Sequence, residues 1–337
     1  MITVEHLSKK YGDVLAVDDL SFTIEDGHIY GFLGPNGAGK STTLNIITGC
    51  LAATSGDIKI DGHDIYEEEK AAKRLIGYLP EIPPLYVDQT PREYLKFVAE
   101  AKGVLKSQIQ EEIDRVVEET HIEEMQNRLI KHLSKGYRQR VGIAQALIGN
   151  PTVIILDEPT VGLDPMQIIE IRDLIAELGK KHTVILSSHI LSEIQAICEK
   201  VLIIYKGKLV AFDNIENLSK SLSAQNQIEI LCDGSEDKVE DILKSISDVS
   251  CFEAKEPEME YNSFVVSTSA DNPLRVCGEL FNAFAENGVS IVKLNPIKTS
   301  LEDIFIELTT LEEEAKEINE DSPITMDDEE YPMQEAR

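Results

Sequence analysis

From residue 1 to about residue 218, short apolar runs alternate with segments whose apolar residues recur at helical spacing. Val153–Leu156 and Val201–Ile204 are continuous apolar runs, which is the pattern of strands buried on both faces of a sheet. Strands that alternate with helices predict a mostly parallel sheet. The expected strands are 2–7, 20–25, 29–34, 58–60, 153–156, 183–186 and 201–205, and the expected helices include one that begins at residue 40, 166–178 and 191–198.

The middle of this region, about residues 85–148, is expected to be helical. Thr90-Pro91-Arg92-Glu93 has the pattern of a capping box with proline at the first helical position. Apolar residues between Ile109 and Val117 recur at helical spacing and predict a second helix. A third helix is expected from Ser134 to Ile148, because a serine is a favoured N-cap residue.

Residues 226–310 have the pattern of a second, smaller unit. Its apolar segments predict the order β-α-β-β-α-β, which is the ferredoxin-like arrangement. A short amphipathic helix, 301–308, is expected to follow the last strand. The expected strands are 227–232, 249–254, 264–268 and 289–294, and the expected helices are 237–245 and 273–287.

The last segment, residues 311–337, is dominated by Asp and Glu and contains few large apolar residues. Such a composition does not bury enough apolar surface to offset the entropy lost on folding, so this tail is expected to be disordered and solvated. Binding of a basic partner is the alternative interpretation.

Composition narrows the class of protein. The chain has 337 residues and a formal net charge of −29, which disfavours binding to nucleic acid, because a basic surface normally supplies most of that affinity. No apolar run approaches the roughly 20 residues of a membrane-spanning helix, and the N-terminus lacks a signal-peptide pattern. A cytoplasmic location is therefore expected. The five cysteines are widely spaced without a C-x-x-C pair and are expected to be reduced thiols.

Gly34-Pro35-Asn36-Gly37-Ala38-Gly39-Lys40-Ser41 fits the phosphate-binding loop pattern and stands between an expected strand and an expected helix. Its glycines allow backbone N–H groups to face a phosphate, and the helix N-terminus adds a favourable dipole. Lys40 is expected to reach the β- and γ-phosphates of a nucleotide, and Ser41 to ligate Mg²⁺. The alternative is an ordinary glycine-rich turn between a strand and a helix.

Two acidic residues follow the apolar run at 153–156. Asp157 is a candidate for holding Mg²⁺ through water, and Glu158 for orienting or deprotonating the attacking water. An isolated Asp-Glu pair is more often a solvated strand end, and it is the phosphate-loop pattern upstream that favours the catalytic interpretation.

The order of these motifs resembles the ATP-binding-cassette ATPases over residues 1 to about 215. In this resemblance Tyr11 corresponds to the aromatic residue that stacks on adenine, and Glu81 occupies the place of a usual glutamine. Leu133–Tyr137 is similar to the family signature, with Lys135 and Tyr137 in place of glycine and glutamine. The remaining matches are residues 34–42 as the phosphate loop, Asp157 and Glu158 as the acid pair, Gly162-Leu163-Asp164 as the loop beyond it and His189 as the switch histidine.

The resemblance implies an α/β fold: a P-loop NTPase cassette with a helical subdomain and an antiparallel β subdomain. The apolar pattern of residues 226–310 adds the small ferredoxin-like domain after it. It further implies a head-to-tail dimer, of two copies or with a related ATPase, that encloses two Mg-ATP molecules. One chain would bind each nucleotide through Tyr11, residues 34–42 (including Thr42) and Glu81. The other chain would face it with Ser134 and Gly136. Asp164, in the loop beyond the acid pair, is a further nucleotide-binding candidate.

The resemblance also predicts the partners and the location. The signature region and Thr299–Phe305 look like an exporter branch, whose ATPases serve antibiotic-resistance, sodium-export and lipid- or polysaccharide-export systems. The expected partners are integral-membrane transporter subunits, so the chain is expected at the inner face of the cell membrane.

Two other functions compete with the transport interpretation. A soluble nucleotide-gated switch acting on a ribosome or DNA is disfavoured by the acidic charge, a single cassette and the lack of a heptad run. A small-molecule kinase would use the same loop but leaves the signature and His189 unexplained. For the second unit, regulation of the ATPase, an extended dimer interface and simple packing all stay open.

Overall fold

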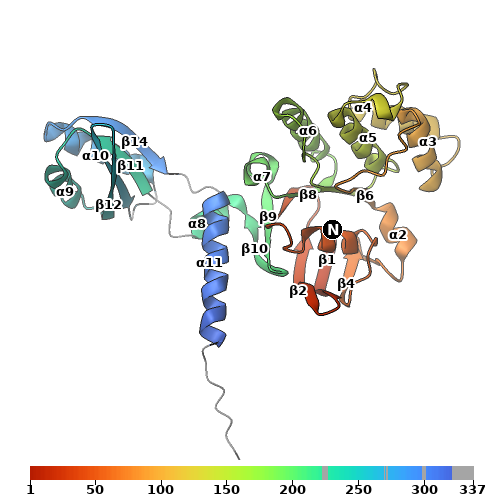
Figure 1. Ribbon diagram of the computed structural model, residues 1–337, viewed down its shortest axis with the longest axis horizontal. Helices are drawn as coiled ribbons and strands as arrows, with labels where there is room; N and C mark the ends of the chain where they lie inside the picture. Colours follow the sequence, from red (N-terminus) through yellow and green to blue (C-terminus); the bar gives the residue numbers. More distant parts are fainter. Residues whose placement is uncertain (222–226, 269, 271, 298–300, 321–337) are drawn as a thin grey trace, which may run out of the picture.

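The computed structural model describes residues 1–221, 227–268, 270, 272–297 and 301–320. These residues form three sheets (Figure 1). Two of the sheets belong to the first part of the chain, and the third forms the smaller unit predicted after it. Among the described residues, no helix combines the length and apolar character needed to cross a membrane.

A six-stranded sheet forms the centre of the first part, in the order β10-β9-β3-β8-β7-β6. All pairs are parallel except the one between β9 and the edge strand β10. Strands β3, β7 and β8 are buried along their whole length, which explains their continuous apolar sequences. The bounds are β3 Ile29–Leu33, β6 Ile76–Leu79, β7 Val153–Asp157, β8 Thr183–Ser188, β9 Lys200–Tyr205 and β10 Lys208–Asn214.

A four-stranded antiparallel sheet packs beside it, in the order β2-β1-β4-β5. Its inward side chains share one apolar core with β3 and with the helix that follows the glycine loop. The segment predicted as a strand at 20–25 is the end of a longer strand, because a hairpin at Gly12 pairs β2 with β1 from Tyr11 onward. The bounds are β1 Ile2–Tyr11, β2 Val14–Ile24, β4 Ser55–Ile60 and β5 His63–Asp64.

The helical region predicted at about 85–148 is present and lies beside β6 in Figure 1. The capping box at Thr90 is confirmed, because its hydroxyl accepts the Glu93 N–H while the Glu93 carboxylate accepts the Thr90 N–H. The helices of the first part are α1 Lys40–Ile47, α2 Glu69–Arg74, α3 Pro91–Ala101, α4 Ile109–Glu119, the 3₁₀ turn Ile130–His132, α5 Lys135–Leu147, α6 Pro165–Leu178 and α7 Leu191–Ile197.

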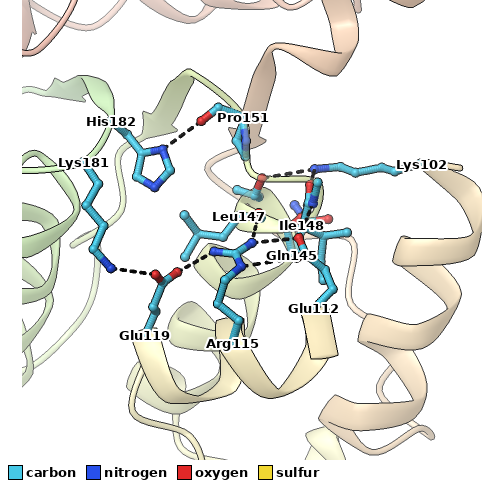
Figure 2. Close-up of polar contacts among 12 residues, drawn as sticks. Lys102, Glu112, Arg115, Glu119, Gln145, Leu147, Ile148, Pro151, Lys181 and His182 are labelled. Atoms are coloured by element: carbon cyan, nitrogen blue, oxygen red, sulfur yellow. Dashed lines mark hydrogen bonds and ion pairs between the residues drawn. The ribbon is translucent and has the colours of Figure 1, made fainter. Parts of the chain in front are cut away.

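Polar contacts hold the C-terminal end of α5 against α3 and α4 (Figure 2). The Lys102 ammonium donates to the carbonyls of Gln145, Ala146 and Ile148, at 3.2, 3.1 and 2.8 Å. Burial of that ammonium lowers the pKa of Lys102 to about 8. Arg115 donates to the Leu147 carbonyl. It also pairs with Glu112 and Glu119, and Lys181 reaches Glu119 from the neighbouring segment.

The second unit has its own apolar core and the predicted β-α-β-β-α-β order. Its sheet is antiparallel throughout, in the order β12-β13-β11-β14, which is the ferredoxin-like arrangement. The bounds are β11 Gln227–Cys232, α9 Glu236–Lys244, β12 Val249–Glu258, β13 Tyr261–Thr268, α10 Pro273–Glu286 and β14 Ile291–Ile297.

The helix after this unit differs from the prediction in length and in partner. Helix α11 runs from Leu301 to Glu320, so the boundary predicted at residue 311 falls inside it, and residues 321–337 lie outside the described part of the chain. Leu301 and Ile304 belong to the core of the first part, and α11 contacts α7, β10 and α8 (Ile215–Ser221). The start of α11 is therefore packed on the first part, although the prediction assigned it to the second unit.

Candidate functional site

The glycine loop leaves the buried strand β3 and ends at the first residue of α1. Two of its glycines have no room for a side chain. A Cβ on Gly34 would lie 2.3 Å from the Ile204 carbonyl oxygen, and one on Gly39 would lie 2.5 Å from that of Ala16. Gly39 also has φ of 106°, in the left-handed region that favours glycine. Neighbouring backbone therefore fixes the path of this loop.

Lys40 is the first residue of α1, and its ammonium turns back over the loop. Its Nζ donates to the Gly34 carbonyl at 2.7 Å and lies 3.9 Å from Glu158 Oε1. Burial lowers the pKa of Lys40, and the carboxylates of Glu158 and Asp157 oppose that shift. A nearly buried cation beside a row of loop N–H groups is suited to an anionic ligand.

Ser41 and Asp157 approach each other across the sheet edge. The Ser41 hydroxyl lies 3.4 Å from Asp157 Oδ1, which also accepts the Ser187 hydroxyl. Hydroxyl and carboxylate oxygens are ligands that Mg²⁺ accepts when it keeps several waters and binds substrate phosphates, so this donor pair fits that ion. Within the described residues, no cluster of three or more His, Cys, Asp or Glu could hold a metal with protein ligands alone.

Glu158 and His189 meet at the carboxyl ends of β7 and β8. His189 Nδ1 lies 2.8 Å from Glu158 Oε2. Glu158 has φ of 50°, which is uncommon for a residue with a side chain. Its N–H donates to the Ser187 carbonyl oxygen and hydroxyl, at 3.2 and 3.1 Å. These contacts hold a strained backbone position, and such strain persists where the surrounding structure enforces it.

A cavity of about 390 Å³ lies over the loop and combines most of the predicted site residues. Ala16 and Val161 also line it, and sequence reasoning missed both because each is a small apolar residue outside any motif. Gly34 and Ala38 shape the loop without lining the cavity, and Asp157 lies behind Ser41. The predicted residues that line it are Pro35, Asn36, Gly37, Gly39, Lys40, Ser41, Thr42, Glu81, Glu158 and His189.

Besides Gly34, Ala38 and Asp157, four further predicted residues do not line this cavity. Tyr11 is about half exposed at the end of β1, with the Lys9 ammonium 5.2 Å from its ring centroid. The Ser134 hydroxyl accepts the Tyr137 N–H at 3.3 Å and caps α5. Gly136 lies under the side chain of Gln167. The Asp164 carboxylate accepts the backbone N–H of Gln167 at 3.0 Å and so caps α6.

A strand, a glycine loop with a buried lysine, a helix, and an acid pair at the end of another parallel strand of the same sheet define a P-loop nucleotide-hydrolysing cassette. The family model described as ABC transporter matches residues 17–161. The bacitracin transport ATP-binding protein BcrA of Bacillus licheniformis is 36% identical over 318 residues, which cover 91% of this chain and 97% of that protein. The chain belongs to the ABC transporter family, as an ATP-binding and ATP-hydrolysing subunit.

Other relatives agree with this assignment. The linearmycin resistance ATP-binding protein LnrL of Bacillus subtilis (strain 168) is 30% identical over 310 residues, which cover 92% of this chain and 98% of that protein. A solved ATP-binding subunit of an ABC transporter is 30% identical, with a TM-score of 0.59, and the match covers 66% of this chain and 92% of that one. A dimer of the cassette MJ0796 with ADP and Pi is 25% identical, with a TM-score of 0.58, and the match covers 64% of this chain and 99% of that one.

Proposed function

We propose that this subunit drives export of a substrate through separate membrane-spanning subunits, by closing and opening an ATP-bound dimer at the inner face of the membrane. The observation that carries the proposal is the cavity in which the loop, Lys40, Glu158 and His189 meet. The named relatives serve bacitracin transport and linearmycin resistance, which supports export and gives no support to a soluble switch.

Each polar group of the cavity has a chemical role in this proposal. The loop N–H groups and Lys40 bind the β- and γ-phosphates, which releases Lys40 from its bond to the Gly34 carbonyl. Glu158 orients and deprotonates the attacking water, and His189 contacts the γ-phosphate while its Nδ1 stays on the Glu158 carboxylate. Ser41 and Asp157 would hold Mg²⁺, which neutralises phosphate charge when bound.

A second chain completes the site in this proposal. The N-terminus of α5, with Ser134 and Gly136, does not line the cavity of its own chain. Its N–H groups and the helix dipole are suited to bind a phosphate of the nucleotide held by the other chain. Tyr11 also does not line the cavity, and its ring is about half exposed. In this proposal the ring stacks on the adenine of the nucleotide bound by its own chain. The dimeric state of the MJ0796 cassette supports the same arrangement.

The helical region carries an exposed apolar surface suited to the membrane partner. Ile82 is 82% exposed directly after Glu81, and the rings of Tyr86 and Phe97 lie 5.1 Å apart, both exposed. Contiguous patches of exposed apolar side chains commonly mark sites of interaction with another protein. Glu81 lines the nucleotide cavity and is followed directly by Ile82, so a movement of Glu81 on nucleotide binding would also move this surface.

The two-chain site is tested by mixing two inactive variants. Lys40→Ala removes the phosphate contact, and Gly136→Asp places a negative charge on the helix end that faces the partner's phosphate. The three atoms nearest to an added Cβ at Gly136 all belong to the flexible Gln167 side chain, so this variant is expected to fold. In an equal mixture half of the dimers are mixed and hold one intact site, so ATPase activity should return to about a quarter of the natural level. No recovery, with both variants folded, would contradict the shared site.

The membrane partner is tested by sedimentation with membranes from the source cells. Ile82→Asp with Phe97→Asp should release the chain from the membrane fraction while ATP binding stays intact. The control is Leu274→Asp, since Leu274 is an exposed apolar residue on the second unit and this change should leave membrane binding unchanged. Full membrane binding by the double variant would reject this surface.

A further inference from the structure

Glu193, in the first turn of α7, is a buried acidic residue with no role in the mechanism above. It is only 7% exposed and does not line the nucleotide cavity. Its Oε2 accepts the Thr160 hydroxyl at 2.5 Å. The next residue, Ile194, is fully buried in the apolar core, so the position borders surroundings that favour an apolar side chain.

The polar neighbours of Glu193 lie on the two segments that carry Glu158 and His189. Thr160 stands two residues after Glu158, and Ser188 immediately precedes His189. The Ser188 hydroxyl accepts the Ile190 N–H at 3.0 Å and lies 3.5 Å from the same Glu193 oxygen. One carboxylate oxygen therefore contacts the segment after β7 and the last residue of β8.

We propose that Glu193 is a positioning residue of the ATPase site, which fixes the spacing between the Glu158 segment and the His189 segment. It acts through Thr160 and Ser188 and keeps His189 Nδ1 at 2.8 Å from Glu158 Oε2. The proposal rests on the roles proposed above for Glu158 and His189. Nucleotide binding depends on the loop and Lys40, which Glu193 does not contact, so its loss should affect turnover rather than affinity.

Three variants of the full chain test this role. Glu193→Leu keeps the size of the side chain and removes the acceptor, and Thr160→Val removes the donor in nearly the same shape. Each should lower kcat by ~10–100-fold, the usual cost of misplacing a reacting group by about an ångström, with ATP affinity within about twofold of the natural chain. Glu193→Gln retains an acceptor oxygen and should keep most of the activity.

Two further measurements separate positioning from a general loss of structure. The double variant Thr160→Val with Glu193→Leu should be no slower than the worse single variant, because both remove the same contact. The side-chain NMR resonances of His189 should shift in Glu193→Leu, while those of the distant His63 stay unchanged. Thermal unfolding of each variant checks that it is folded.

Some outcomes reject this inference, and another rejects the underlying mechanism. Natural kcat in folded Glu193→Leu and Thr160→Val, alongside an inactive Glu158→Gln chain, overturns the positioning role alone. An equal loss of kcat and ATP affinity also overturns it, because the contact would then support the fold as a whole. Full activity of Glu158→Gln would instead remove the catalytic assignment on which both proposals depend.

Discussion

Helix α11 offers a sharp comparison, because it carries two isoleucines in opposite environments. Ile304 is 0% exposed in the core that it shares with Ile194 of α7, whereas Ile306 is 61% exposed on the same helix. Replacing each by alanine removes the same atoms from the same secondary structure. Any difference between the two variants therefore measures the docking of α11 on α7, α8 and β10.

The expected size of the difference follows from burial. Ile304→Ala loses the transfer free energy of its buried methyl groups and leaves a cavity, which together cost ~2–4 kcal/mol. Ile306→Ala removes mostly hydrated atoms, and its change should stay within about 0.5 kcal/mol. Because α11 is a separate helix docked on the surface of the cassette, the cost should fall first on its local undocking rather than on global unfolding.

Hydrogen exchange followed by mass spectrometry reads that local opening. A loss of ~2 kcal/mol corresponds to ~30-fold faster exchange for amides that open by undocking. Ile304→Ala should show this acceleration in peptides from α11 and from α7, with the strands of the second unit unchanged. Ile306→Ala should match the natural chain throughout. Equal exchange in the two variants would refute the packing of α11 on the first part.

Two further predictions concern the glycine loop and the end of α5. Gly39→Ala should abolish ATP binding, measured by equilibrium titration, since its Cβ would lie 2.5 Å from the Ala16 carbonyl oxygen. Gly37→Ala is the control: its Cβ would meet no atom within 4 Å, so the affinity for ATP should fall less. Arg115→Met leaves Glu112 without its cation and should cost ~1–3 kcal/mol in urea unfolding at neutral pH. By contrast, breaking the exposed ion pair between Lys131 and Asp88, at 2.9 Å, with Lys131→Met should cost at most about 0.5 kcal/mol. Burial raises the pKa of Glu112, but the hydrogen bonds from Arg115, together with others, outweigh that effect and keep the pKa below its ordinary value of 4.5. The difference in unfolding free energy between the natural chain and Arg115→Met should therefore be present above pH 4.5 and shrink as the pH falls below it.

The first part of the fold was predictable where short-range patterns decide the structure. The glycine loop, the capping box at Thr90 and the apolar strands each encode a local backbone conformation, and the structure has them at the expected places. Most of the predicted site residues also line one cavity, because loops after neighbouring parallel strands meet at one sheet edge. The roles assigned to those residues stay predictions.

The rest depended on contacts between segments far apart in the chain. The spacing of Leu301 and Ile304 predicts an amphipathic helix but does not name the surface that it covers, and that surface proved to be α7. Glu193 belongs to no motif used in the prediction, and nothing in the sequence around it distinguishes a buried acid from a solvated one. Only the position of Thr160, brought close by the sheet, reveals its contact.

The packing of α11 narrows the alternatives left open for the second unit. Helices α8 and α11 stand before and after that unit in sequence, and in the structure they contact each other beside β10 and α7. The two helices that flank the unit are therefore packed on the cassette, and α11 contacts α7, which begins two residues after His189. A displacement of α11 would reach α7 through the side chains that pack the two helices together. Simple packing thus explains the position of α11. For regulation of the ATPase by the second unit, α11, α7 and Glu193 form a continuous set of contacts that ends at Thr160, two residues after Glu158.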